Sequence, residues 1–285
     1  MQSSIHRYLR SPVVPVVLSM VSLHAGAAIA KSLFEQITPL GLVSLRLSLA
    51  AGMLLIFTRP HWRHYTWSGY RLLGLLGLSI AVMNTLLYHA IAYIPLGVAV
   101  TLEFVGPLGI ALVHSRRGLD LLWVALAAAG VMLLAPIGGI TLHPFGVMLS
   151  LMSGGCWAAY IVLSARVGKV FSGSEGVAMA MAAGAIAILP FGIAAEGRNL
   201  LSPWVLLLGL MVAMLSSALP YSLEMAALRQ LPVKVFGVLM SLEPAVASCV
   251  GLLILGEQLS LRVMVAIILV SGASAGSAWG ADAHK

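Results

Sequence analysis

The stretch PLGVAVTLEFVGP, from Pro95 to Pro107, is almost wholly apolar and carries one carboxylate, Glu103. A second version of it, PVKVFGVLMSLEP, runs from Pro232 to Pro244 and carries Glu243. In both versions a threonine or serine and then a leucine precede the glutamate. A charged side chain at the centre of a membrane-spanning helix costs about 2.5–3.5 kcal/mol. This repetition indicates that the two glutamates serve a purpose and that the rest of the chain holds them around a cavity.

The amino-acid composition indicates the class of protein. Hydrophobic residues make up 60% of the chain and charged residues only 9%, whereas a soluble domain carries about 25% charged residues. So few charges cannot cover a surface that faces water, so we expect a multi-pass membrane protein surrounded by a lipid bilayer. The net charge of +7 comes from basic residues that lie between apolar runs. That pattern indicates membrane topology and no nucleic-acid partner.

Ten apolar runs are long enough to cross a bilayer, which takes about 20 helical residues. They predict an all-α polytopic membrane protein with ten transmembrane helices and short connections. The first run lacks a convincing cleavage site and is expected to remain as a signal anchor. The runs are Val13–Ala30, Pro39–Phe57, Leu72–Ala92, Leu96–Val113, Leu119–Pro136, Phe145–Ala165, Gly176–Ala195, Trp204–Leu228, Val233–Leu255 and Leu261–Trp279.

The distribution of lysine and arginine predicts that both termini are cytoplasmic. With that orientation, twelve of the sixteen basic residues fall on the inner side of the membrane. Lys31, Arg198 and Arg262 fall on the outer side, and Arg46 lies inside the second run. Lysine and arginine collect in cytoplasmic loops of membrane proteins, so this bias supports the predicted topology.

The two halves of the chain also resemble each other. Three residue pairs share a constant offset of 137 residues: Ile91 and Leu228, Pro95 and Pro232, and Pro107 and Pro244. Because five helices per half is an odd number, the second half must insert upside down relative to the first. We therefore predict two inverted five-helix repeats, residues 1–140 and 141–285, an arrangement typical of transporters. Chance similarity between helices rich in alanine, glycine and leucine is the alternative.

Glu103 and Glu243 are the first candidates for a functional site. Facing lipid would be prohibitively costly, so both are expected to face the interior or a water-filled cavity. A carboxylate in such a place can bind and release a proton during transport. The alternative is a structural hydrogen bond to a neighbouring helix or to a backbone amide freed near Pro107 or Pro244.

Glu224 follows Tyr221 by three residues in ALPYSLEM, so the two side chains share a helix face. Pro220 removes a backbone donor just before them and favours a kink. A kink beside a carboxylate and a phenol suits the wall of a cation-binding site. Pairing of Glu224 with Arg229 or Lys234 near the inner end of the helix is an equal alternative.

Two basic residues are also candidates. Arg46 lies deep in the second run and can neutralise a glutamate or hold a substrate carboxylate through its fork of donors. An internal ion pair that fixes helix packing explains Arg46 equally well. Lys31 lies near the outer end of the first run, where snorkelling explains it more simply than contact with a substrate carboxylate.

Four further candidates form two pairs at helical spacing. Asn84 and Tyr88 lie four residues apart, and they either line a cavity or bridge helices through hydrogen bonds. Trp157 and Tyr160 lie three residues apart and form an aromatic wall that suits a substrate ammonium group. Helix packing is the commoner reason for such an aromatic pair.

No pattern typical of an enzyme is visible in the sequence. Zinc-protease, serine-hydrolase and nucleotide-binding motifs are absent, and the short connections exclude a nucleotide-binding domain. His24 and His89 change charge near neutral pH, but no spacing suggests a metal site. We expect neither an enzyme nor an ATP-driven pump, and no cofactor.

Several stretches resemble a known transporter superfamily. The five-plus-five layout, Leu255-Gly256-Glu257 and Arg46 are similar to the EamA-type drug/metabolite transporters. Within that superfamily, six stretches resemble bacterial exporters of threonine and homoserine, and the resemblance covers nearly the whole chain. The stretches are KSLF (Lys31–Phe34), PLGVAVTLEFVGPL (Pro95–Leu108), SRR (Ser115–Arg117), CWAAYI (Cys156–Ile161), ALPYSLEM (Ala218–Met225) and FGVLMSLEPA (Phe236–Ala245).

The resemblance implies a bacterial inner-membrane exporter of threonine, homoserine and related small amino acids that works by alternating access. Such a cargo needs an anion for its ammonium group, a cation for its carboxylate and a polar group for its hydroxyl. The ammonium group is expected to contact Glu103, Glu243 or Glu224. The carboxylate is expected to contact Arg46 or Lys31, and the hydroxyl Asn84, Tyr88 or Tyr221. Proton antiport through Glu103 or Glu243 is the expected driving force.

Two other functions stay open. An exporter of other metabolites or of larger lipophilic or aromatic compounds would need a roomy aromatic cavity with little need for paired charges. A membrane enzyme or structural subunit is disfavoured by the missing motifs and by the inverted repeat. Faces of glycine and alanine would permit a homo-oligomer, although they serve internal packing equally well.

Overall fold

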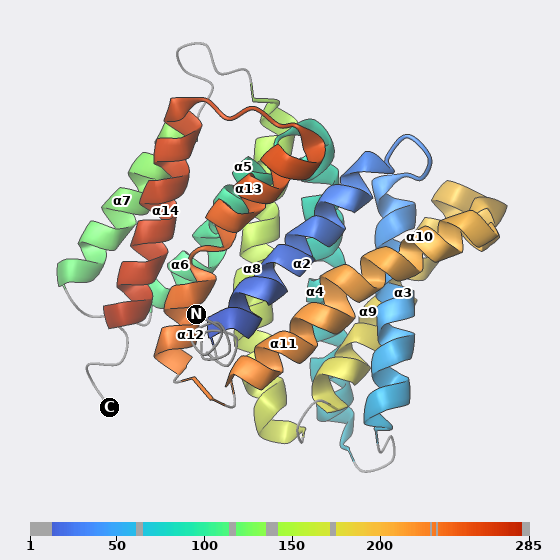
Figure 1. Cartoon of the computed structure of the whole chain (residues 1–285). Coiled ribbons are helices and arrows are strands. Elements are labelled where there is room, and N and C mark those ends of the chain that lie inside the picture. Colours follow the sequence, from blue (N-terminus) through green and yellow to red (C-terminus); the bar gives the residue numbers. More distant parts are fainter. Residues whose placement is uncertain are drawn as a thin grey trace, which may run out of the picture.

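The computed structural model describes residues 13–60, 65–113, 118–134, 142–171, 175–228, 230–231 and 233–280. These residues form helices and short connections, and Figure 1 shows long helices packed side by side. Six helical spans are long and apolar enough to cross a membrane, and four shorter apolar helical segments accompany them. The predicted all-α, multi-pass membrane fold is therefore confirmed.

Each predicted apolar run coincides with one helix or with consecutive helical segments. The first half contains α2 (Val13–Ser32), α3 (Pro39–Thr58), α4 (Trp67–Tyr93), α5 (Leu96–Glu103), α6 (Val105–Val113) and α7 (Gly118–Leu134). The second half contains α8 (Pro144–Val170), α9 (Glu175–Glu196), the 3-10 helix η1 (Gly197–Leu201), α10 (Pro203–Ala213), the π-helix η2 (Met214–Ala218), α11 (Leu219–Leu228), α12 (Val233–Met240), α13 (Glu243–Leu255) and α14 (Leu261–Gly280).

Short polar residues and glycine set several helix ends. Thr38 caps α3 by accepting a hydrogen bond from the Gly41 N–H at 3.2 Å, and Thr66 caps α4 in the same way. At the other end of a helix, Gly256 has a φ of 65° and terminates α13 in the left-handed conformation, which glycine adopts without steric cost. This turn positions the glutamate that follows it.

The two glutamate-containing stretches are interrupted helices. α5 ends at Glu103 and α6 begins at Val105, while α12 ends at Met240 and α13 begins at Glu243. Both interruptions fall at the shared Thr/Ser-Leu-Glu sequence, and in each case a proline, which has no N–H to donate, follows shortly afterwards. Interrupted helices free backbone groups that a binding site can use.

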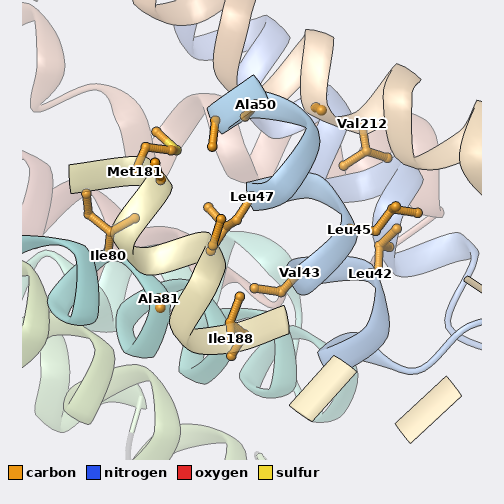
Figure 2. Packing of buried hydrophobic residues seen from close by; sticks show 14 of the residues in the cluster. Leu42, Val43, Leu45, Leu47, Ala50, Ile80, Ala81, Met181, Ile188 and Val212 are labelled. Atoms are coloured by element: carbon orange, nitrogen blue, oxygen red, sulfur yellow. The ribbon is translucent and has the colours of Figure 1, made fainter. Parts of the chain in front are cut away.

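One hydrophobic core joins α3, α4, α9 and α10, and Figure 2 shows its interdigitated side chains. Leu47 of α3, Ile80 of α4 and Met181 of α9 are each at most 3% exposed. Lipid tails are as apolar as these side chains, so close van der Waals packing holds such helices together. Glycine permits the close approach: a Cβ added at Gly77 of α4 would meet the carbonyl oxygen of Ala180 in α9.

Helices from the two halves pair throughout the structure. α3 packs against α9, α5 against α13, and α7 against α14, the last pair standing together at one side of Figure 1. α4 packs against α8, and α11 packs against α2. Elements far apart in sequence therefore surround the centre of the bundle, where the interrupted helices lie against α2 and α8.

Candidate functional site

A cavity of about 260 Å³ lies among the helices, and both halves of the chain contribute to its wall. The interrupted stretches supply one glutamate each, and α2, α3, α4, α8 and α11 supply most of the remaining side chains. Eight of the ten residues predicted as a substrate site line it: Arg46, Asn84, Tyr88, Glu103, Trp157, Tyr160, Glu224 and Glu243.

Glu103 is held at the cavity by α8. Its side chain is 5% exposed, and the Ser153 hydroxyl donates to its Oε1 at 2.6 Å. α8 can come this close because it carries Gly154, where an added Cβ would lie 2.6 Å from the Glu103 carbonyl oxygen. Ser153 was not among the predicted site residues, because a single serine beside glycines gives no signal of its long-range partner.

Glu243 begins α13 and faces α2. Its Oε1 lies 3.5 Å from the Nε2 of His24, and both side chains are at most 6% exposed. Neither His24 Nε2 nor the second carboxylate oxygen of Glu243 has a hydrogen-bond partner among the described residues. His24 lines the same cavity, although no sequence pattern had marked it as a site residue.

Arg46 reaches the cavity from α3 and is 7% exposed. It donates from Nη1 to the Tyr88 hydroxyl at 2.8 Å and from Nη2 to the Ser216 carbonyl at 3.2 Å. Nε donates to the Ser217 hydroxyl at 3.4 Å. All of these partners are neutral, so the internal ion pair considered for Arg46 does not form among the described residues, and its positive charge faces the cavity.

The π-helix η2 supplies the carbonyl groups on this side of the cavity. Ser216 O accepts from Arg46, and Leu215 O accepts from the Ser22 hydroxyl at 2.6 Å. A π-helix bulges the backbone and is frequent at functional sites. It ends at Ala218, two residues before Pro220, whose missing donor favours such a distortion. The bulge binds the neighbouring helices α2 and α3, and the kink predicted at Pro220 stays a prediction.

The remaining cavity residues combine packing with exposure to the cavity. Asn84 donates to the Ile80 carbonyl of its own helix at 2.8 Å. Trp157 packs edge-on against Phe104, with ring centroids 4.9 Å apart, and Tyr160 is half-buried. Each of these residues therefore both packs within the bundle and lines the cavity.

Glu224 lines the cavity from α11. Tyr221 lies on the same helix, but its side chain is outside the described part of the structure, as are Arg229 and the side chain of Lys234. The predicted pairing of Glu224 with either basic residue therefore stays a prediction.

Lys31 does not line the cavity. Its Nζ lies 2.6 Å from Glu257 Oε1 and donates to the Ile94 carbonyl at 3.0 Å. Glu257 also accepts from the Leu96 N–H at 2.9 Å. The outer cluster, named for the predicted orientation and defined as Lys31, Glu257 and the backbone at Ile94 and Leu96, ties together the end of α2, the start of α5 and the α13–α14 connection.

Comparison with known proteins places the chain in a family. A family model of EamA-like transporters matches residues 144–278. The threonine/homoserine exporters RhtA of Escherichia coli (strain K12) and Salmonella typhimurium (strain LT2) are each 43% identical over 269 residues, which cover 93% of this chain and 90% of theirs. A protein of known crystal structure shares the fold over 94% of this chain and 96% of its own, with a TM-score of 0.60 and 19% identity. Residues 144–278 therefore match the EamA-like transporter family, and the chain belongs to the family of the threonine/homoserine exporter RhtA.

Proposed function

We propose that the protein exports threonine, homoserine and related small amino acids across the bacterial inner membrane. The relatives that are 43% identical over nearly the whole chain are exporters of threonine and homoserine. The observation that carries the proposal is the distribution of charge in the cavity, where acidic groups and one guanidinium line a single small space. A zwitterionic amino acid carries a positive ammonium group and a negative carboxylate, which complement the acidic groups and the guanidinium.

The cavity offers a partner for each group of such a cargo. Carboxylates from α5, α11 and α13 complement the ammonium group. Arg46 complements the carboxylate, because its planar fork of donors matches two oxygens. Asn84 and Tyr88 lie next to it on α4 and can hydrogen-bond a side-chain hydroxyl. Lys31, which pairs with Glu257, is a weaker candidate for contact with the cargo.

The size of the cavity favours a small cargo over a large lipophilic one. Sites for drug-sized ligands enclose about 300–1,000 Å³, whereas this cavity encloses about 260 Å³. A lipophilic cargo would also leave the buried glutamates and the guanidinium unmatched, and burying unpaired charge is costly. Export of other metabolites is the second candidate, supported by the aromatic wall of Trp157 and Tyr160.

The proposed architecture is ten membrane crossings in two inverted repeats, residues 1–140 and 141–285, with both termini in the cytoplasm. Six long spans and four shorter apolar segments supply ten candidate crossings. Corresponding helices of the two halves pack against each other, namely α3 with α9, α5 with α13 and α7 with α14. Inverted repeats support alternating access, in which one repeat rocks against the other around a central site.

Proton antiport is the proposed driving force, with Glu103 and Glu243 as proton carriers. Both side chains are 5% exposed and lie at the interruptions of their helices. An intramembrane carboxylate of this kind is typical of proton relays in transporters. In the proposed cycle, cargo binds from the inside, leaves to the outside, and a proton taken up by a glutamate accompanies the return.

The test is threonine transport by purified protein in liposomes, with and without an imposed pH gradient. We expect the intact protein to exchange threonine across the membrane and to accelerate net flux when the gradient is imposed. Glu243→Gln is expected to abolish the acceleration. Absence of threonine and homoserine flux would refute the cargo. Flux that ignores the gradient in the intact protein, together with unchanged flux in Glu103→Gln and Glu243→Gln, would refute proton coupling through these residues.

A further inference from the structure

His24 occupies an unusual place in the cavity wall. It lies in α2 at 4% exposure, and its Nε2 has no hydrogen-bond partner among the described residues. The nearest charged atom given for it is Glu243 Oε1 at 3.5 Å, and Glu243 Oε2 is buried without a partner as well. Two unsatisfied polar atoms therefore lie side by side at the same cavity.

Unsatisfied atoms of this kind point to a ligand. The great majority of buried polar groups in native proteins have a hydrogen-bond partner, and leaving one without a partner is unfavourable. In its neutral form imidazole has one nitrogen that accepts, and an ionised carboxylate only accepts. A group that only donates hydrogen bonds can satisfy two neighbouring acceptors. A primary ammonium is such a group, with three donors and no acceptor.

The other charged and titratable groups around His24 agree with this assignment. Glu224 on α11 and Glu103 on α5 line the same cavity and add further carboxyl oxygens that can accept hydrogen bonds. Arg46 on α3 is the one arginine or lysine among the described lining residues, and it donates to the Tyr88 hydroxyl of α4 at 2.8 Å. The remaining titratable group is Tyr160 on α8. A cation is therefore attracted to the side of the cavity that holds the carboxylates.

We propose that His24 and Glu243 together form the subsite that binds the ammonium group of the cargo. Neutral His24 accepts one ammonium N–H through Nε2, and Glu243 accepts another. This assignment rests on the proposed export of amino acids and adds a specificity-determining residue to that site.

Three variants test the role of His24. His24→Gln keeps an acceptor in the side chain but cannot become charged, whereas His24→Leu removes the acceptor. His89→Leu is the matched control: His89 lies on α4, contacts the carbonyl oxygen of Thr85 in its own helix at 2.7 Å and is not a lining residue of the cavity. The readout is the KM for threonine in threonine–threonine exchange by liposomes with pH 8 on both sides.

At pH 8 we expect His24→Leu to raise the KM about tenfold, and His24→Gln to stay within about threefold of the intact protein. The KM of His89→Leu should equal that of the intact protein. N-acetylthreonine, which lacks the ammonium group, should not compete with threonine.

Three results would overturn the assignment: an unchanged KM in His24→Leu, a KM in His24→Gln as high as in His24→Leu, or competition by N-acetylthreonine as strong as that by unlabelled threonine. Exchange that is intact in every variant would leave the proposed export standing while removing His24 from the site. Lack of exchange by the intact protein would overturn the export proposal and the assignment together. Circular dichroism of each purified variant separates loss of binding from loss of folding.

Discussion

Replacing Glu257 with glutamine is expected to open the end of the bundle at which the outer cluster lies. In the structure the Glu257 carboxylate accepts from Lys31 at 2.6 Å and from the Leu96 N–H at 2.9 Å. The Leu96 N–H belongs to the first residue of α5, so the carboxylate also meets the positive end of that helix dipole. Glutamine preserves the size of the side chain and removes the charge.

The free energy lost on this substitution follows from the partial burial of the Lys31–Glu257 ion pair. The side chains of Lys31 and Glu257 are 21% and 11% exposed. Exposed ion pairs contribute about 0–1 kcal/mol, and removing one partner of a fully buried pair costs about 3–5 kcal/mol. An intermediate value of about 2 kcal/mol is therefore expected. Since 1.4 kcal/mol is a factor of 10 in an equilibrium constant, the equilibrium between the closed and open outer end should shift about 30-fold.

Chemical labelling from outside the cell measures that equilibrium. The two native cysteines, Cys156 and Cys249, are free and are first replaced by serine, and Leu23→Cys places one thiol in the cavity wall. A membrane-impermeant maleimide added to intact cells should label this thiol about 30-fold faster in Glu257→Gln. A change in the labelling rate smaller than about twofold would refute the prediction that the outer cluster holds this end closed.

Two glycines provide a matched comparison for the same assay. A Cβ added at Gly251 would meet Glu257 Oε2, whereas nothing lies within 4 Å of a Cβ added at Gly272. Gly251→Ala should therefore displace the carboxylate and speed labelling in the same direction as Glu257→Gln. In Gly272→Ala the Leu23→Cys thiol should be labelled at the same rate as without a glycine substitution. Faster labelling in Gly272→Ala would indicate a general loosening of the helix bundle.

Two further changes test the walls of the cavity. Tyr88→Phe removes the hydroxyl that accepts from the Arg46 guanidinium at 2.8 Å and should raise the KM for threonine about threefold to tenfold. Tyr93→Phe changes an exposed side chain and should leave the KM unchanged. Equal effects of the two substitutions would argue against a specific role for Tyr88. Gly154→Ala would place a Cβ 2.6 Å from the Glu103 carbonyl oxygen and should destabilise the protein by about 1–3 kcal/mol. Its midpoint of thermal unfolding in detergent should fall by several degrees, whereas Gly155→Ala, with nothing within 4 Å, should leave the midpoint unchanged.

The positions of the helices and most of the cavity wall follow from local properties of the sequence. Apolar length predicts a spanning helix regardless of its neighbours. The cost of a charge in lipid drives Glu103, Glu243 and Arg46 inward, and inward-facing residues of neighbouring helices must meet. Helical spacing then adds the partner on the same face, as it does for Asn84 and Tyr88. These rules need no knowledge of which helices are neighbours.

Contacts between distant segments could not be predicted in this way. Lys31 pairs with a residue 226 positions later, and no local spacing distinguishes that partner from a snorkelling lysine. Neither His24 nor Ser153 has a charged residue within four positions in the sequence, so their importance appears only when α2 meets α13 and α8 meets α5. Leu255-Gly256-Glu257 was identified as a family motif, but its physical role depends on the left-handed Gly256, which ends α13 and brings Glu257 to the start of α5.

The proposed inverted repeat also predicts a counterpart of the outer cluster at the other end of the molecule. The offset of 137 residues that relates Pro95 to Pro232 and Pro107 to Pro244 also relates Asp120 to Glu257. Arg166 is exposed near the end of α8, as Lys31 is found near the end of α2. If Asp120 and Arg166 join when the inner end closes, Asp120→Asn should favour the state whose outer end is closed. The Leu23→Cys thiol should then be labelled more slowly from outside the cell, the reverse of Glu257→Gln, because a two-state equilibrium responds in opposite directions to loss of either closing contact. Faster labelling in Asp120→Asn would contradict this relation between the two halves.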